Sequence, residues 1–71
     1  MKCVLYCGSK VIKEIVAYHC YDAIKDMWDY LTITDDVDDI PWDWSFTDFF
    51  DLLIRLDEVH INSMASIKLI R

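Results

Sequence analysis

Glycine and proline are almost missing from this sequence, which has one of each, Gly8 and Pro41, in 71 residues. A phosphate-binding loop of the glycine-rich kind needs several glycines close together, so the sequence excludes such a loop. The chain also has no internal repeat and no flexible linker. We therefore expect residues 1–71 to form a single compact domain.

Long apolar stretches are also missing, although the hydrophobic fraction is 55%. No run approaches the roughly 18 residues that cross a bilayer, and the first ten residues do not resemble a signal peptide. The three cysteines are an odd number, which does not suggest a disulfide scaffold. These features predict a cytoplasmic protein.

Basic residues are nearly absent from one long segment. Between Asp22 and Asp51 there are ten acidic residues and a single base, Lys25. The rest of the chain has three acidic and six basic residues. Phosphate groups and anionic membranes would be repelled by the acidic segment, so we expect neither direct nucleic-acid binding nor membrane binding there. A basic protein partner is favoured.

The N-terminal region has the pattern of a β-hairpin. Residues 2–7 are short and apolar, Gly8–Ser9 suits a two-residue type II′ turn, and residues 10–20 are rich in β-branched side chains. The alternative is one long helix over residues 10–31, capped by Ser9. Its apolar pairs recur every four residues, however, and such a stripe drifts around a helix of 3.6 residues per turn. We favour the hairpin.

Two helices are expected after the hairpin, at about residues 21–31 and 46–56. Ser45 is suited to cap the second helix, with Asp48 in its first turn. Alternation of apolar residues near the C-terminus predicts a last strand, which a bend at Asn62–Ser63 would split into a hairpin. The predicted fold class is α+β, in which a small antiparallel sheet (the N-terminal hairpin plus the C-terminal strand) packs against the two helices.

Residues suited to catalysis or metal binding do not form a recognisable motif. Cysteines and histidines occur without a knuckle spacing for zinc, and a chain this short has little volume for an enclosed active site. Counted from Asp36, an EF-hand loop would place Pro41 and Thr47 where glycine and glutamate are needed. We expect no enzymatic activity, no catalytic residues, no cofactor and no metal. A metal-dependent or enzymatic domain, which would use Cys3, Cys7, His19, Cys20 or His60, is a remaining alternative.

Acidic residues and tryptophans supply the candidate partner-binding site. Three aspartates spaced i, i+4 and i+7 share the outer face of the first predicted helix, although like charges at this spacing destabilise a helix. The connection that follows adds five more carboxylates and two tryptophans, a residue type enriched in interface hot spots. The predicted site consists of Asp22, Asp26, Asp29, Asp35, Asp36, Asp38, Asp39, Asp43, Trp42 and Trp44.

In its size, its net charge of −6 and its aspartate rows, the chain resembles the small acidic inhibitors encoded by phages. That class includes anti-CRISPR proteins and other DNA mimics. The resemblance implies a stoichiometric inhibitor that binds the basic nucleic-acid-binding surface of a host protein, such as a CRISPR effector or another defence enzyme. The competing hypothesis is a small structural or adaptor module that acts through protein contacts, with a homodimer as one form.

Overall fold

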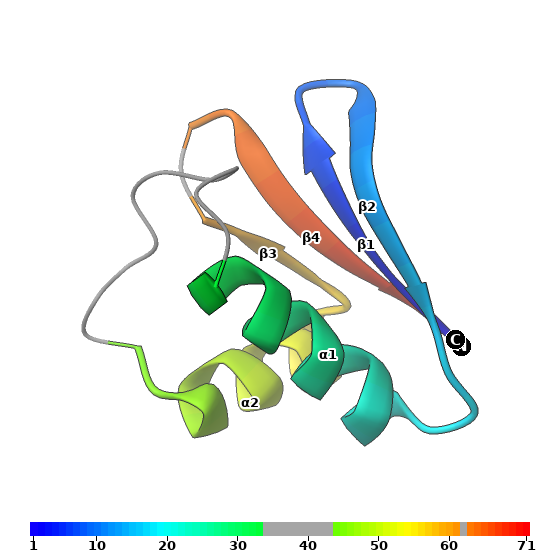
Figure 1. Cartoon of the computed structure of the whole chain (residues 1–71). Coiled ribbons are helices and arrows are strands. Elements are labelled where there is room, and N and C mark those ends of the chain that lie inside the picture. The colour runs from blue at the N-terminus through cyan, green and yellow to red at the C-terminus, as the bar shows by residue number, and fades with distance from the viewer. Residues whose placement is uncertain (34–43, 62) are drawn as a thin grey trace.

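The computed structural model describes residues 1–33, 44–61 and 63–71 of the chain. These residues form two layers, with one antiparallel sheet and two helices that lie against one of its faces (Figure 1). The elements in chain order are β1 (Lys2–Cys7), β2 (Lys10–Val16), α1 (Cys20–Ile33), α2 (Phe46–Leu56), β3 (Glu58–His60) and β4 (Ala65–Ile70). The predicted α+β class is confirmed.

The N-terminal hairpin is also confirmed, and the alternative of a long helix over residues 10–31 is wrong. β2 pairs antiparallel with β1, and Gly8 turns the chain between them with a φ of +64°. Glycine adopts this backbone without the steric cost that a Cβ atom would bring. β2 is rich in β-branched residues, which fit a pleated surface better than a helix. The strand ends at Val16, earlier than expected, because Cys20 already begins α1.

Helix α2 begins and ends where the sequence predicts, and both of its ends are capped. The Ser45 hydroxyl accepts a hydrogen bond from the backbone N–H of Asp48, while the Asp48 carboxylate accepts one from the N–H of Ser45. This reciprocal pair is a capping box, which satisfies two of the N–H groups left open at a helix start. At the other end Asp57 takes a left-handed conformation, and its N–H donates to the Leu53 carbonyl.

The C-terminal segment forms two antiparallel strands, as the predicted hairpin requires, although Asn62 of the expected Asn62–Ser63 bend lies outside the described residues. The N–H of Ile61 donates to the Ala65 carbonyl across this turn, at 2.9 Å. β4 lies between β1 and β3, which gives the sheet the order β2-β1-β4-β3. Within the described chain, β2 and β3 are therefore the two edges of the sheet.

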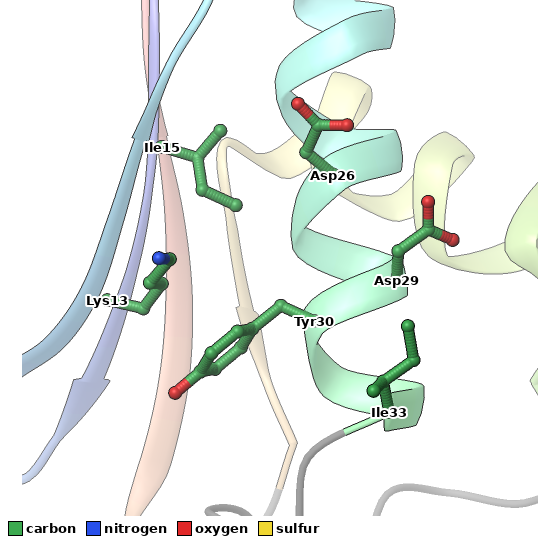
Figure 2. A pocket seen from close by; sticks show the side chains of 6 residues that line it. All are labelled: Lys13, Ile15, Asp26, Asp29, Tyr30 and Ile33. Atoms are coloured by element: carbon green, nitrogen blue, oxygen red, sulfur yellow. The ribbon is translucent and has the colours of Figure 1, made fainter.

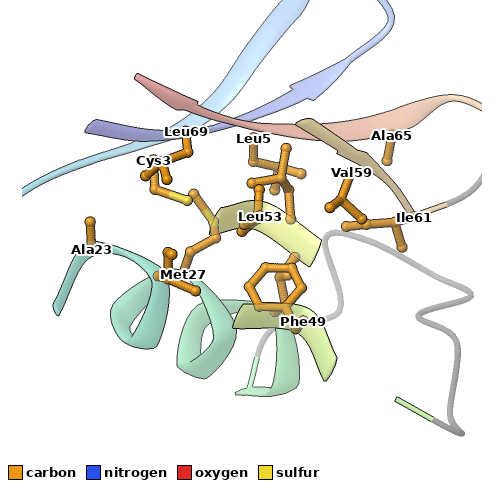
Figure 3. Close-up of a cluster of buried hydrophobic side chains, with 13 residues drawn as sticks. Cys3, Leu5, Ala23, Met27, Phe49, Leu53, Val59, Ile61, Ala65 and Leu69 are labelled. Carbon is orange, nitrogen blue, oxygen red and sulfur yellow. The ribbon is translucent and has the colours of Figure 1, made fainter. Parts of the chain in front are cut away.

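The core fills the space between the sheet and the helices (Figure 3). Alternate residues of the strands point toward the helices, and each helix contributes one apolar stripe. The central side chains, each with less than 2% of its surface exposed, are Cys3, Leu5, Ile24, Met27, Phe49, Leu53 and Ile67. Burial raises the pKa of the Cys3 thiol to about 12, so this cysteine stays protonated and unreactive near neutral pH.

No helix in the described ranges is both long enough and apolar enough to cross a membrane.

Candidate acidic interaction surface

The first predicted aspartate row lies on the outer face of α1. The opposite face of the same helix buries Ala23, Met27 and two other apolar residues against the sheet, so the 3.6-residue period directs the aspartates away from the core. Asp22 and Asp26 are exposed, and Asp29 is half-buried. Side chains four residues apart on a helix have Cβ atoms about 5–6 Å from each other. The row therefore forms a short ladder of carboxylates along the helix.

The three aspartates of this ladder differ in their partners. Asp29 forms an ion pair with Lys25, whose Nζ lies 3.1 Å from its carboxylate. For Asp22 and Asp26, no cation among the residues that the structure describes lies within ion-pair distance. Two exposed and uncompensated carboxylates thus stand one helical turn apart. A cationic group from another molecule would be attracted to this position.

The acidic residues of α2 are used within the fold. Asp48 completes the capping box, and its hydrogen bonds with the backbone and hydroxyl of Ser45 hold the pKa of its carboxyl below the ordinary value. Asp51 lies 2.8 Å from the guanidinium of Arg55, one turn further along the helix. These carboxylates stabilise the helix locally. They are therefore poorer candidates for partner binding than those of α1.

Most of the predicted site falls on the connection between α1 and α2. Trp44 is described: it is half-buried and packs against the hydrophobic core. Its side chain thus helps to hold the start of α2 onto the domain. The predicted residues that lie outside the described part of the chain are Asp35, Asp36, Asp38, Asp39, Trp42 and Asp43.

An aromatic cluster joins the outer parts of the two helices, and the sequence reasoning did not identify it. Phe46 contacts Tyr21 edge-on with ring centroids 5.7 Å apart, and it also contacts Trp28 and Phe50. The ammonium group of Lys25 lies 5.4 Å from the centre of the Phe46 ring. The spacing of Tyr21, Lys25 and Trp28 at i, i+4 and i+7 was the available signal. The cluster fixes α1 against α2, so the carboxylate ladder is carried on a rigid support.

A groove between α1 and β2 was also missed (Figure 2). Its volume is about 410 Å³, and it is open to solvent along one side. The side chains that line it come from both elements: Lys13, Ile15, Asp26, Asp29, Tyr30 and Ile33. The signal available in the sequence was the position of Ile33, one turn beyond the aspartate row. In the structure the Ile33 side chain is 79% exposed. The sequence reasoning ended this helix at residue 31, before Ile33.

The residues that the structure describes contain no group of three or more His, Cys, Asp or Glu side chains placed to hold a metal ion. Cys3 is buried, while Cys7 and Cys20 are half-buried, and all three thiols are free. The Sγ atom of Cys20 lies 3.1 Å from the Sδ atom of Met1, a contact between sulfur atoms that holds the N-terminus against α1.

No family model, no curated protein and no solved structure matches this chain.

Proposed function

We propose that this chain is a stoichiometric protein inhibitor that binds the basic nucleic-acid-binding surface of a host protein through its acidic face. A CRISPR effector or another defence enzyme would be a partner of this kind. The observation that carries the proposal is the pair of exposed, uncompensated carboxylates of Asp22 and Asp26 on α1. Because neither one takes part in an ion pair within the described fold, both are available to a cationic partner.

The mechanism would rest on charge and shape together. Carboxylates one helical turn apart are separated on the scale of neighbouring phosphates along a nucleic-acid strand. A groove built from Arg and Lys side chains would meet the ladder as it meets a nucleic-acid backbone. Attraction between the two charged surfaces raises the rate of encounter, and the rigid helix limits the entropy lost on binding.

The test uses DNA-cellulose loaded with bacterial lysate at low salt. The purified chain is expected to release a subset of the DNA-bound proteins, and higher salt is expected to suppress its binding to them. The proposal is wrong if the chain releases no protein at any concentration. It is also wrong if a tight partner is found whose binding ignores both salt and competing DNA.

A matched pair of variants separates the acidic ladder from net charge. Asp22→Asn with Asp26→Asn removes the two uncompensated carboxylates and should weaken release about tenfold or more, since each charge contact contributes on the order of 1 kcal/mol. Asp51→Asn with Asp57→Asn removes the same charge from two ion-paired positions. This control should retain most of the activity. Equal losses in both variants would show that only net charge matters.

A second candidate function, an adaptor module that forms homodimers, has one observation in its favour. Val16, Tyr18 and Met1 are exposed side by side and line an apolar hollow of about 570 Å³ together with Ala17. Tyr18 is 95% exposed. Sedimentation velocity over a wide concentration range tests this alternative. A dimer that Tyr18→Ser dissociates would support it, and a monomer at all concentrations would remove it.

A further inference from the structure

The outer edge of β2 presents backbone groups that no described strand pairs. The N–H of Ala17 donates to the carbonyl of Met1 at 3.0 Å, so Ala17 and Met1 form a hydrogen-bonded pair of the β1–β2 ladder. In an antiparallel ladder such pairs alternate with pairs that share no hydrogen bond. Ile15 therefore bonds to β1, while the backbone groups of Glu14 and Val16 point away from it. β2 is the first strand in the sheet order, so this side is an edge.

The groove described above runs directly beside this edge. In Figure 2 the side chains of Ile15 on β2 and Tyr30 on α1 point into the space between the strand and the helix. Ile33 adds exposed apolar surface at the end of the helix, and Asp26 adds a carboxylate without a described cation. The groove thus combines open backbone groups, an apolar floor and the carboxylate of Asp26 beside Ile15, while the ammonium group of Lys13 lies further along, over the Tyr30 ring.

We infer that an extended segment of a partner protein adds to β2 as a fifth strand and lies over this groove. Backbone groups of the segment would bond to Glu14 and Val16, which is the usual basis of affinity when a peptide extends a sheet. Side chains alternate along a strand, so every second one would point into the groove. An Arg or Lys opposite Ile15 would reach Asp26, which lies at the same level of the groove in Figure 2. An apolar side chain two positions away would lie toward Ile33.

A second copy of this chain fits the edge less well than a basic segment of another protein. Lys13 is the middle residue of β2, and its side chain points toward the helix layer, where its ammonium group lies 5.4 Å from the centre of the Tyr30 ring. Antiparallel pairing of two copies about this residue would place two lysines directly opposite each other, which is destabilising. A charged residue directed inward is a common protection of edge strands against uncontrolled pairing. Lys13 thus disfavours this pairing of two copies, whereas a segment of another protein can place its basic residue opposite Ile15, beside Asp26, and an apolar residue opposite Lys13.

This inference goes beyond the proposed function, since such a segment need not come from a nucleic-acid-binding protein. The proposed function and this inference share only the use of Asp26 and the need for a cationic partner. They are separated by a test that contains no host protein and no nucleic acid.

The probe is a synthetic peptide, acetyl-TVTRTVT-amide, in which Val and Arg occupy alternate positions. Amide hydrogen exchange of the ¹⁵N-labelled chain is followed by NMR without the peptide and with it. At ten times the dissociation constant, exchange at Glu14 and Val16 should slow about tenfold, because exchange then requires the free state. The amide of Ile15 should change little, since it already bonds to β1. Only strand addition predicts this alternation.

Two control peptides and two protein variants complete the design. The peptide with Glu in place of Arg should bind at least about tenfold more weakly, and so should the peptide N-methylated at alternate residues, which cannot form the ladder. Asp26→Asn should weaken binding of the Arg peptide about twofold to fivefold. Asp51→Asn removes the same charge from α2, at a residue that does not line the groove, and should leave binding nearly unchanged.

Three results would overturn the inference. The first is that the Arg peptide does not bind at millimolar concentration. The second is that it binds without slowing exchange at Glu14 and Val16, or that the N-methylated peptide binds equally well. The third is that both amides are already protected in the chain alone. Protection that rises with protein concentration would identify a second copy as the occupant, and protection at every concentration would show that the chain covers its own edge.

Discussion

The two helices of this domain pack against the same sheet but use their acidic residues in opposite ways. In α2, Asp48 completes a capping box, Asp51 pairs with Arg55, and the last turn carries a basic residue that suits the helix dipole. In α1, the residue before the helix is His19, the last turn has no basic residue, and Asp22 and Asp26 lack described ion-pair partners. The charges of α2 stabilise its own structure. In α1, Asp29 pairs with Lys25, but Asp22 and Asp26 have no described ion-pair partner, which is why we propose that these two act on a partner.

The comparison predicts that both helices depend equally on the core. Met27 on α1 and Leu53 on α2 are both fully buried. Met27→Ala and Leu53→Ala should each lower the free energy of unfolding by about 2–5 kcal/mol, because each removes buried apolar contacts and leaves a cavity. Urea unfolding followed by circular dichroism measures the loss. Met27→Leu, which keeps the volume, should cost less than about 1.5 kcal/mol and remain folded if the alanine variants do not.

If Met27→Ala cost much less than Leu53→Ala, α1 would be held by something other than its apolar face, and the comparison would fail.

The next largest effect is expected at the start of α2, where a capping box stabilises the helix. Ser45→Ala removes the hydroxyl that accepts from the N–H of Asp48 and should lower the free energy of unfolding by about 1 kcal/mol. Thr47→Ala changes an exposed residue of the same turn and should stay within about 0.5 kcal/mol of the wild type. Chemical denaturation of both variants checks this. Equal losses would mean that the capping box does not stabilise α2.

The pH dependence of stability isolates the contribution of the Asp48 carboxylate in the capping box. Hydrogen bonds from Ser45 lower the pKa of Asp48 in the folded state below its ordinary value of 3.8. A lowered pKa means that the ionised carboxylate favours folding above pH 3.8, and that this contribution is lost as the pH falls through the folded-state pKa. Asp48→Asn should therefore be less stable than the wild type at pH 6, and the two should converge in strong acid. Thermal unfolding from pH 2 to pH 6 measures the difference, with Asp26→Asn as the control for an exposed aspartate. A constant difference between wild type and Asp48→Asn over this range would contradict the assignment.

Neutralising one acidic residue on each helix should change the free energy of unfolding by small amounts of opposite sign. Asp51→Asn removes an i, i+4 ion pair with Arg55 and should lower the free energy of unfolding by about 0.3–0.5 kcal/mol. Asp26→Asn relieves repulsion from Asp22 and should raise it by a few tenths of a kcal/mol. Differential scanning calorimetry of the two variants, side by side, measures the signs. A loss of stability in Asp26→Asn as large as that in Asp51→Asn would show that α1 uses its acids structurally.

The sequence was sufficient to predict those helices and strands for which several local signals agree. Gly8 sits where a hairpin turn needs a positive φ, and Ser45 with Asp48 forms a capping box that fixes the start of α2. It was less informative about ends that depend on tertiary contacts. α1 extends to Ile33, and no turn residue at that point signals a stop. The separate strand β3 spans only three residues, too few for alternation to identify it alone.

The candidate site was predicted only in part. Helical spacing was enough to place Asp22, Asp26 and Asp29 on one outer face of α1. It could not show that Lys25 compensates Asp29 and leaves the other two, because that depends on side-chain conformation. The groove between α1 and β2 could not be foreseen either, since it joins elements whose pairing only the folded sheet defines.

The position of β1 in the sheet also constrains how the protein is made. β1 pairs with β4, and β4 is synthesised only after both helices. During translation, the first hairpin can form early, but one edge of β1 waits for a partner until residues 65–70 have left the ribosome. Sheets that depend on such distant pairing fold slowly and expose apolar strand surface while they wait. Truncation within residues 65–70 should therefore leave one side of β1 unpaired and prevent stable folding, rather than simply shorten the sheet.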